Sequence, residues 1–286
     1  MAERFITKRI PIGAVTVSLA DVKKIFERLS KHLGEEADRQ TKDLIKPLDQ
    51  GQEEFDEHVA EARKNAFRIT VTVAGSDGQD LYGDTLALFH SPNLPDEISR
   101  IYMTNVVAYE GHTRRRPPNA FSMLLDFSKP PLIDNDNPVS NPTPNNSNVS
   151  VEGASETWVA SIVDATMGIL GKRNNGRKLL HAAFIYDFGL MLLGLPLGLY
   201  VCLRLSSLVE ASLGSVHPFL SAVAYVYLML VGLWLYRILF GYTKWAFPTV
   251  ELSDTKSRSQ NHRAFWYTIV TGLVSAAIFE IWRYVS

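Results

Sequence analysis

The residue type most suggestive of chemistry is an acid inside a long apolar run. Asp187 lies six positions after His181, in a stretch that is otherwise apolar as far as Leu203. An ionisable group inside a membrane span costs free energy and is therefore a candidate functional residue. Asp187 is also close to the end of the run, where it could pair with Lys178 or stay hydrated. The sequence leaves both interpretations open.

A basic triplet is the second candidate. Arg114, Arg115 and Arg116 precede two prolines, in what we expect to be a loop between two strands. Guanidinium groups bind phosphate and carboxylate oxygens strongly, so the triplet could bind a phosphate-rich ligand or anionic lipid headgroups. The alternative is the solvated tip of a hairpin.

Other chemistries have less support. The acidic segment from Glu53 to Glu61 contains His58 but no H-E-x-x-H pattern, and residues 75–84 lack the phosphate-binding glycine loop. No G-x-S-x-G motif is present, and Cys202, the one cysteine, lies in an apolar run. We therefore predict no metal site and no cofactor, and the catalytic residues of any enzyme stay unknown. Asp77, Asp80 and Asp84 would be the first candidates for an enzyme of unknown type.

Charge and cysteine content narrow the class of protein. The formal net charge is −1, which disfavours nucleic-acid binding by bulk charge. A single cysteine rules out a disulfide within one chain. The residues after Met1 lack the apolar core of a signal peptide, so we expect the first domain to be cytosolic.

Residues 1–128 predict a soluble α+β domain in which antiparallel strands pack against amphipathic helices. Ser18 to Asp21 form a capping-box sequence. Apolar residues then recur at helical spacing as far as Leu33, which predicts a helix ending near Gly34. The other expected elements are short strands in 6–17, a helix over 53–66, and strands over 67–73, 85–89, 101–108 and 121–127.

The rest of the soluble part follows a change in composition. Residues 129–148 contain five prolines and six asparagines, which predicts a loop or linker. Residues 149–178 then predict a strand and a connecting helix, capped by Ser155, that complete the soluble domain.

Residues 179–286 predict a transmembrane module of about three helices. The apolar stretches are 181–203, 218–240 and 264–282, and about 20 helical residues span a bilayer core. Gly194 and Gly198 have the spacing of a close helix-packing contact, with Pro196 between them. Basic residues cluster before the first stretch and between the second and third, which predicts a cytosolic N-terminus and a C-terminus on the opposite side.

These features favour a non-enzymatic, membrane-anchored sensor, whose cytosolic domain binds a small ligand or a protein partner and is coupled to helices in the lipid bilayer. The expected location is the inner or plasma membrane, with several passes. One alternative is an effector that forms a pore or perturbs the bilayer when triggered, and another is a membrane-bound enzyme. A homo-oligomer is also compatible with the glycine spacing.

Overall fold

The computed structural model describes residues 5–42, 44–49, 51–131, 138–214, 217–254 and 258–285. It divides into two compact units. The sheet unit contains residues 1–128, 145–176 and 249–256, and the helical unit contains 129–144, 177–248 and 257–286. The segment 249–256, which follows the second apolar stretch, thus belongs to the sheet unit.

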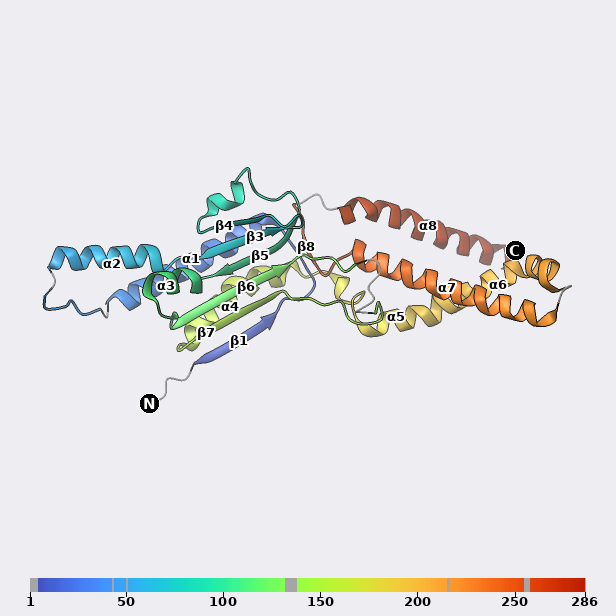
Figure 1. The fold of residues 1–286 in the computed structure, drawn as a ribbon, viewed down its shortest axis with the longest axis horizontal. Coiled ribbons are helices and arrows are strands. Elements are labelled where there is room, and N and C mark those ends of the chain that lie inside the picture. The colour runs from blue at the N-terminus through green and yellow to red at the C-terminus, as the bar shows by residue number, and fades with distance from the viewer. Residues whose placement is uncertain are drawn as a thin grey trace. The chain divides into compact units, whose positions relative to one another are not determined.

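The sheet unit is built on a six-stranded antiparallel sheet (Figure 1). In spatial order the strands are β1 (Ile6–Pro11), β7 (Asn148–Gly153), β6 (Asn119–Asp126), β5 (Ile98–Thr104), β3 (Thr70–Gly75) and β4 (Asp80–Gly83). Alternating side chains set its register, because Val71 lies opposite Met103, and Met123 lies opposite Val149, all of them buried. The predicted α+β class with antiparallel strands is confirmed.

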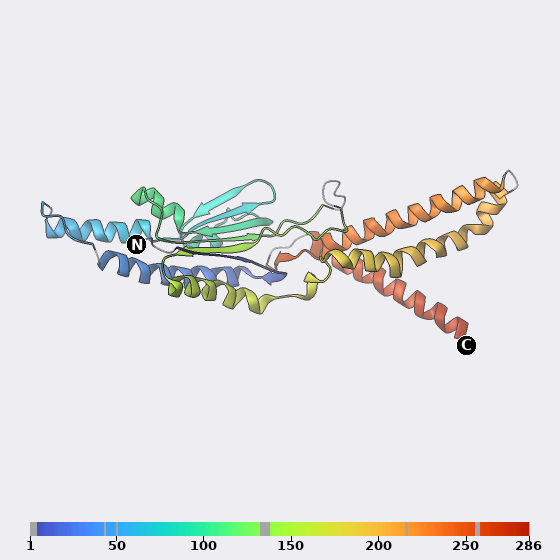
Figure 2. The same cartoon turned by 90° about the horizontal axis from the view of Figure 1, so that it is seen from below.

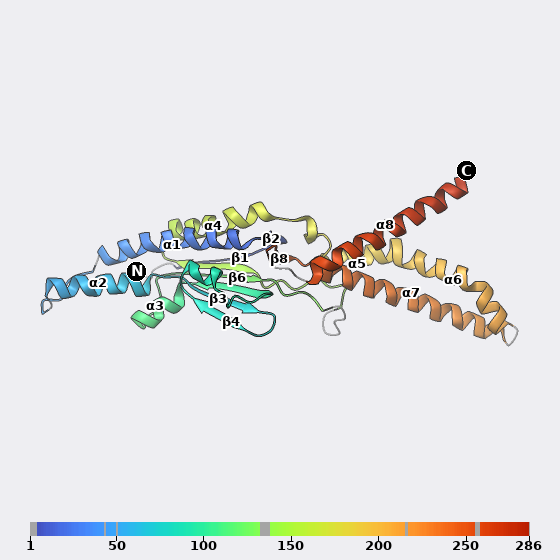
Figure 3. The same ribbon diagram turned by 90° about the horizontal axis from the view of Figure 1, so that it is seen from above.

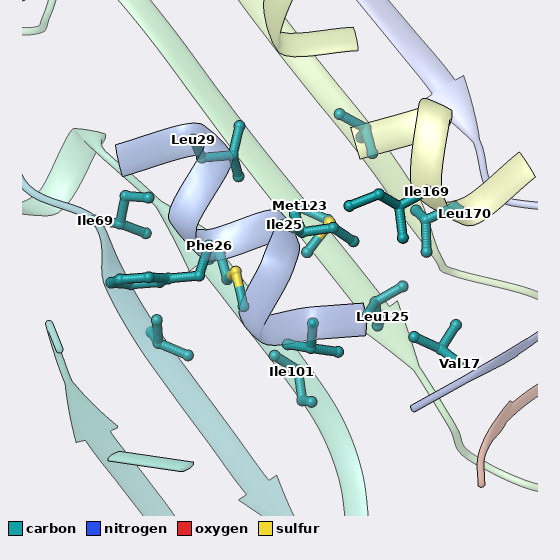
Figure 4. Packing of buried hydrophobic residues seen from close by; sticks show 14 of the residues in the cluster. Val17, Ile25, Phe26, Leu29, Ile69, Ile101, Met123, Leu125, Ile169 and Leu170 are labelled. Carbon is teal, nitrogen blue, oxygen red and sulfur yellow. The ribbon is translucent and has the colours of Figure 1, made fainter. Parts of the chain in front are cut away.

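Two helices cover one face of this sheet. Helices α1 (Leu19–Lys42) and α4 (Glu156–Leu170) lie side by side over it (Figures 2 and 3). Ile25 and Leu29 of α1 meet Met123 of β6 and Leu170 of α4 in the core (Figure 4). Each such side chain stabilises the fold by about 1.5–3 kcal/mol when fully buried.

Three predicted elements differ from the structure. Helix α1 continues past Gly34 to Lys42, because Ala37 in the extension is buried and outweighs the roughly 1 kcal/mol cost of an internal glycine. The predicted strand over 85–89 is the 3-10 helix η1 (Leu86–His90), since a tight turn at Gly78 (φ 84°) lets β4 pair with β3 directly.

The predicted strand over 101–108 stops at Thr104. The Thr104 hydroxyl accepts a hydrogen bond from the Val106 amide (3.1 Å) and donates one to the Phe121 carbonyl (2.8 Å). These bonds turn the chain into helix α3 (Val106–Thr113). The predicted helix over 53–66 is α2 (Gln52–Ala66), in agreement with the sequence.

A second, smaller pair of strands joins distant parts of the chain. β2 (Val15–Val17) pairs in parallel with β8 (Val250–Leu252), which lies between the last two helices in the sequence. Both strands are part of the sheet unit.

The helical unit begins with 32 continuous helical residues, Ala183–Gly214. They comprise α5 (Ala183–Gly189), the π-helical turn η4 (Leu190–Gly194), α6 (Leu195–Val209) and the π-helical turn η5 (Glu210–Gly214). η4 ends two residues before Pro196, whose ring and missing N–H disrupt regular α-helical bonding. Helices α7 (Pro218–Ala246) and α8 (Arg258–Val285) follow.

Two of these helical segments, Ala183–Gly214 and Pro218–Ala246, are long and apolar enough to cross a membrane. They are longer than the predicted stretches 181–203 and 218–240, and most of their large apolar side chains are exposed, as Leu203 (70%) and Tyr227 (68%) show. Among the described residues, these two segments meet the requirement by their length and amino-acid composition.

The predicted linker is divided between the two units. In the helical unit, the Lys244 ammonium donates to the carbonyls of Val139 and Asn141 (both 2.8 Å). The two ring nitrogens of His181 lie 2.7 Å from the Thr143 hydroxyl and 2.7 Å from the Phe247 carbonyl. Residues 145–148 belong to the sheet unit, and 132–137 lie outside the described residues.

Helices α6 and α7 approach most closely at two glycines. A Cβ atom added to Gly232 would lie 3.1 Å from the Cα atom of Gly198, and one added to Gly198 would lie 2.5 Å from the Met229 sulfur. Gly194 lies against the Tyr236 ring of α7, one turn further along the same face. The glycines therefore allow the two backbones to approach.

We expect Gly232→Leu to destabilise the α6–α7 pair by about 1–3 kcal/mol, because the opposing atom is backbone and must be displaced. Thermal unfolding of the full-length protein in mild detergent measures the effect. Gly272→Leu on α8 is the matched control, since no atom lies within 4 Å of a Cβ added there. Equal melting temperatures for the two variants would contradict the close contact.

Candidate functional site: a polar pocket and the start of α1

The arginine triplet does not form one cluster. Arg114 ends α3 in a left-handed conformation (φ 58°), and its amide donates to the Glu110 carbonyl. Arg116 forms an ion pair with Glu152 of β7 (2.7 Å). All three side chains are exposed. The structure therefore spreads the triplet over a helix end and a neighbouring strand.

The other predicted residues are also separated. Asp187 is exposed on α5, and it forms no ion pair with Lys178 in the part of the chain that the structure describes. Asp84 pairs with Arg68, and Asp77 accepts a hydrogen bond from the Gln79 amide within its turn. Among the described residues no group of three or more His, Cys, Asp or Glu side chains could hold a metal ion.

A polar pocket lies where β1 and β7 meet the loop that precedes β7. Its volume is about 260 Å³, and it is lined by Arg9, Pro11 and residues 145–148. Arg9 and Pro11 lie opposite Ser150 and Asn148 in the register, on the face of the sheet away from α1 and α4. The Arg9 side chain is exposed and makes no hydrogen bond or ion pair within the described ranges.

Hydrogen bonds hold the wall of this pocket in place. The Asn145 amide group donates to the Ile12 carbonyl (2.6 Å), and the Ile12 amide donates to the Ser147 carbonyl (2.9 Å). The Asn146 side chain donates to the Asp126 carboxylate (2.9 Å). The loop is therefore fixed to the link between β1 and β2, since Ile12 follows directly after β1.

Two segments that lead into the helical unit bind the β1–β2 link and β2. The Asn175 amide donates to the Ala14 carbonyl (3.0 Å), and its side chain donates to the Thr16 hydroxyl (3.0 Å). From the other segment, the Thr249 carbonyl accepts from the Val15 amide (3.1 Å) as β8 begins. Residues 174–175 precede α5, and β8 joins α7 to α8, so β2 contacts both connections.

The same two segments bind the first turn of α1. Ser18 and Asp21 form the predicted capping box: the Asp21 amide donates to the Ser18 hydroxyl, and the Ser18 amide donates to the Asp21 carboxylate (both 3.1 Å). Arg173 donates to the other Asp21 oxygen (2.8 Å). Asp254, just after β8, accepts a hydrogen bond from the Leu19 amide (2.5 Å). We call these contacts of β2 and the first turn of α1 the junction.

The electrostatics of the junction keep Asp21 ionised. Burial by itself raises the pKa of this carboxyl group, but hydrogen bonds from Arg173 and Ser18, together with the charge of Arg173, outweigh burial and hold the pKa below its usual value. The positive end of the α1 dipole also favours the carboxylates of Asp21 and Asp254.

This arrangement can bind and position groups. The pocket offers the Arg9 guanidinium to a polar ligand, while the amide groups of its wall donate within the protein. The junction connects this wall to residues 173–175 and 249–254 of the same unit, which adjoin the apolar helices in the sequence. Of these residues the sequence indicated only Ser18 and Asp21. Arg9, Arg173 and Asp254 carried no local signal, because their partners are distant in the chain.

Comparison with protein-family models, with curated proteins and with solved structures finds no match in any of the three. The geometry of the pocket and the junction is therefore the basis for a functional proposal.

We expect Asp21→Ala to destabilise the full-length protein at pH 7 by about 1–2 kcal/mol, the usual cost of losing a helix cap. Because the pKa of Asp21 is lowered on folding, its contribution is present at neutral pH and is lost as the pH falls below about 4. The gap in melting temperature between wild type and variant should therefore narrow as the pH is lowered from 7 towards 3.

The control is Asp96→Ala, because Asp96 is exposed. A pH-independent gap for Asp21→Ala, or the same gap for Asp96→Ala, would show that the capped carboxylate does not stabilise the junction.

Proposed function

We propose that this protein is a membrane-anchored sensor in which the sheet unit binds a polar, anionic ligand and passes the binding event to the membrane helices. The pairing of β2 with β8 carries the proposal. A strand that lies between two apolar helices in the sequence is built into the ligand-binding unit, so any shift of β2 acts directly on the chain that joins those helices.

The exposed apolar surface of the helical unit supports insertion into a membrane. Leu203 on α6, Tyr227 on α7 and Trp282 on α8 are all more than two-thirds exposed. Soluble monomers rarely expose continuous apolar surface on this scale, whereas a bilayer covers it. Beyond the two segments that are long and apolar enough to span a membrane, we propose that α8, a helix of 28 residues, makes a third pass.

The distribution of basic residues supports a cytosolic sheet unit. Basic residues flank the start of α5 (Arg177 and Lys178) and the α7–α8 connection (Lys244 and Arg263), as the positive-inside rule requires of cytosolic ends. The connection also contains β8, whose place in the sheet unit requires α7 to end and α8 to begin on the side of the membrane where that unit lies.

The topology can be tested with reporters fused to Met1 and to Ser286 of the full-length protein. We expect the protein to stay in the membrane fraction after alkaline washing. The N-terminal reporter should be active only in the cytosol, and the C-terminal reporter only outside it. Two reporters on the same side would contradict three passes, and a chain soluble without detergent would contradict membrane anchoring.

The pocket supplies the proposed ligand site. A ligand with an anionic group would pair with Arg9 and displace the loop 145–148 or draw it inward. Because this loop is hydrogen-bonded to Ile12, such a shift reaches Ala14 and Val15, which bind Asn175 and Thr249. A two-state device of this kind requires the ligand to bind one arrangement more tightly than the other.

The sensor proposal predicts that full-length protein in mild detergent retains an anionic compound from a small-molecule extract of the expressing cells. Arg9→Ala should lower retention at least tenfold, whereas Lys8→Ala should not. Lys8 is the neighbouring exposed cation, and its side chain points to the opposite face of the sheet because side chains alternate along a strand. Mass spectrometry of the released compounds gives the readout.

Coupling between the ligand pocket and the β2–β8 pair can be measured separately. Addition of the retained compound should change amide hydrogen exchange at Val15–Val17 and Val250–Leu252 in the wild type and not in Arg9→Ala. Retention without any change at these strands would mean binding without transmission, and the sensor function would then be wrong.

A further inference from the structure

An apolar groove runs between three helices of the helical unit. Its volume is about 610 Å³, within the roughly 300–1,000 Å³ of many ligand sites. Phe188 and Leu192 line it from the first helical segment, Phe240 from α7 and Ile269 from α8. Apart from Leu180, the groove is thus built from segments that we propose to lie in the membrane.

The few polar groups that line the groove are bonded within the helices. The Tyr236 hydroxyl donates to the Tyr186 carbonyl (3.0 Å). The Thr243 hydroxyl donates to the Leu239 carbonyl (2.8 Å) and accepts from the Trp266 indole (2.9 Å). The groove therefore offers hydrocarbon and aromatic surface, which suits an acyl chain and not a polar solute.

Two cations are concentrated at one end of the groove. Arg177 and Arg263 lie three positions before two lining residues, Leu180 and Trp266. Arg177 donates to the Pro248 carbonyl (3.2 Å), and Arg263 donates to the Ala246 carbonyl (2.8 Å). Their guanidinium carbons lie 5.9 Å and 5.2 Å from the centre of the same ring, that of Phe247. The two charges therefore converge at the end where the helices meet the basic flanks.

We propose that this groove binds one anionic phospholipid, with an acyl chain along the apolar lining and the headgroup phosphate at Arg177 and Arg263. The inference rests on the proposed membrane location and adds a specific lipid site to it. Charge favours this occupant over a neutral transmembrane helix, which would bring no anion to the guanidiniums, whereas an anionic lipid supplies both an acyl chain and a phosphate. A second copy of this chain carries exposed carboxylates such as Asp187, so the experiment below distinguishes it from a lipid.

The site can be tested by native mass spectrometry of the full-length, delipidated protein in mild detergent. The probes are dioleoyl-phosphatidylglycerol and dioleoyl-phosphatidylcholine at equal concentration. We expect about a tenfold preference for the anionic lipid. Arg177→Gln and Arg263→Gln should each weaken its binding about fivefold, the effect expected for one interfacial cation, and should leave the zwitterionic lipid unchanged.

Matched variants separate the effect of charge on lipid binding from the effects of groove shape and of misfolding. Arg263→Lys should keep most of the preference because the charge remains. Arg204→Gln, a cation 5.7 Å from the Tyr200 ring and outside the groove, should keep all of it. Ile269→Trp should fill the groove and weaken binding of both lipids, whereas Phe265→Trp, exposed on α8 and outside the lining, should not.

Equal binding of the two lipids, or binding insensitive to both arginines, would overturn the lipid site and leave the membrane anchoring intact. A dimer that Ile269→Trp dissociates, with lipid binding unchanged, would show that a second copy occupies the groove. A chain that needs no detergent would remove the membrane proposal itself, and the lipid site with it.

Discussion

The structure depends on a three-residue parallel pairing between β2 and β8. The neighbouring bond from the Leu19 amide to the Asp254 carboxylate joins residues 235 positions apart in the sequence. Closing so long a loop costs only slightly more entropy than closing a short one, since the cost grows with the logarithm of length. The pairing makes the α7–α8 connection a structural part of the sheet unit.

The two units bury apolar surface in different ways. In the sheet unit, Ile25, Leu29 and Met123 are fully buried between the helices and the sheet, so water is excluded by the protein itself. The helical unit buries few side chains. Helices α6 and α7 are in close backbone contact at Gly198 and Gly232. Its large apolar side chains face outward, an arrangement that is favourable only where the surroundings are also apolar.

In the sensor that we propose, the junction is suited to transmission because it is held by many modest contacts. Each hydrogen bond that Ala14, Val15 or Thr16 makes with Asn175 or Thr249 contributes only about 1 kcal/mol. Under that proposal, a ligand of ordinary affinity can shift the balance between two arrangements. The capping box and the Arg173 bond fix the first turn of α1, against which such a shift would act.

Local patterns in the sequence determined the elements whose stability is local. The Ser18–Asp21 capping box, the Ser155 cap and the alternation along 67–73, of which residues 70–73 belong to β3, needed only neighbouring residues to be visible. The extension of α1 past Gly34, the helical turn at 86–90 and the pocket of Arg9 with residues 145–148 did not. Each depends on burial or hydrogen bonding by distant residues. β8 is the clearest case, because three residues carry no periodicity of their own and become a strand only when β2 supplies the partner.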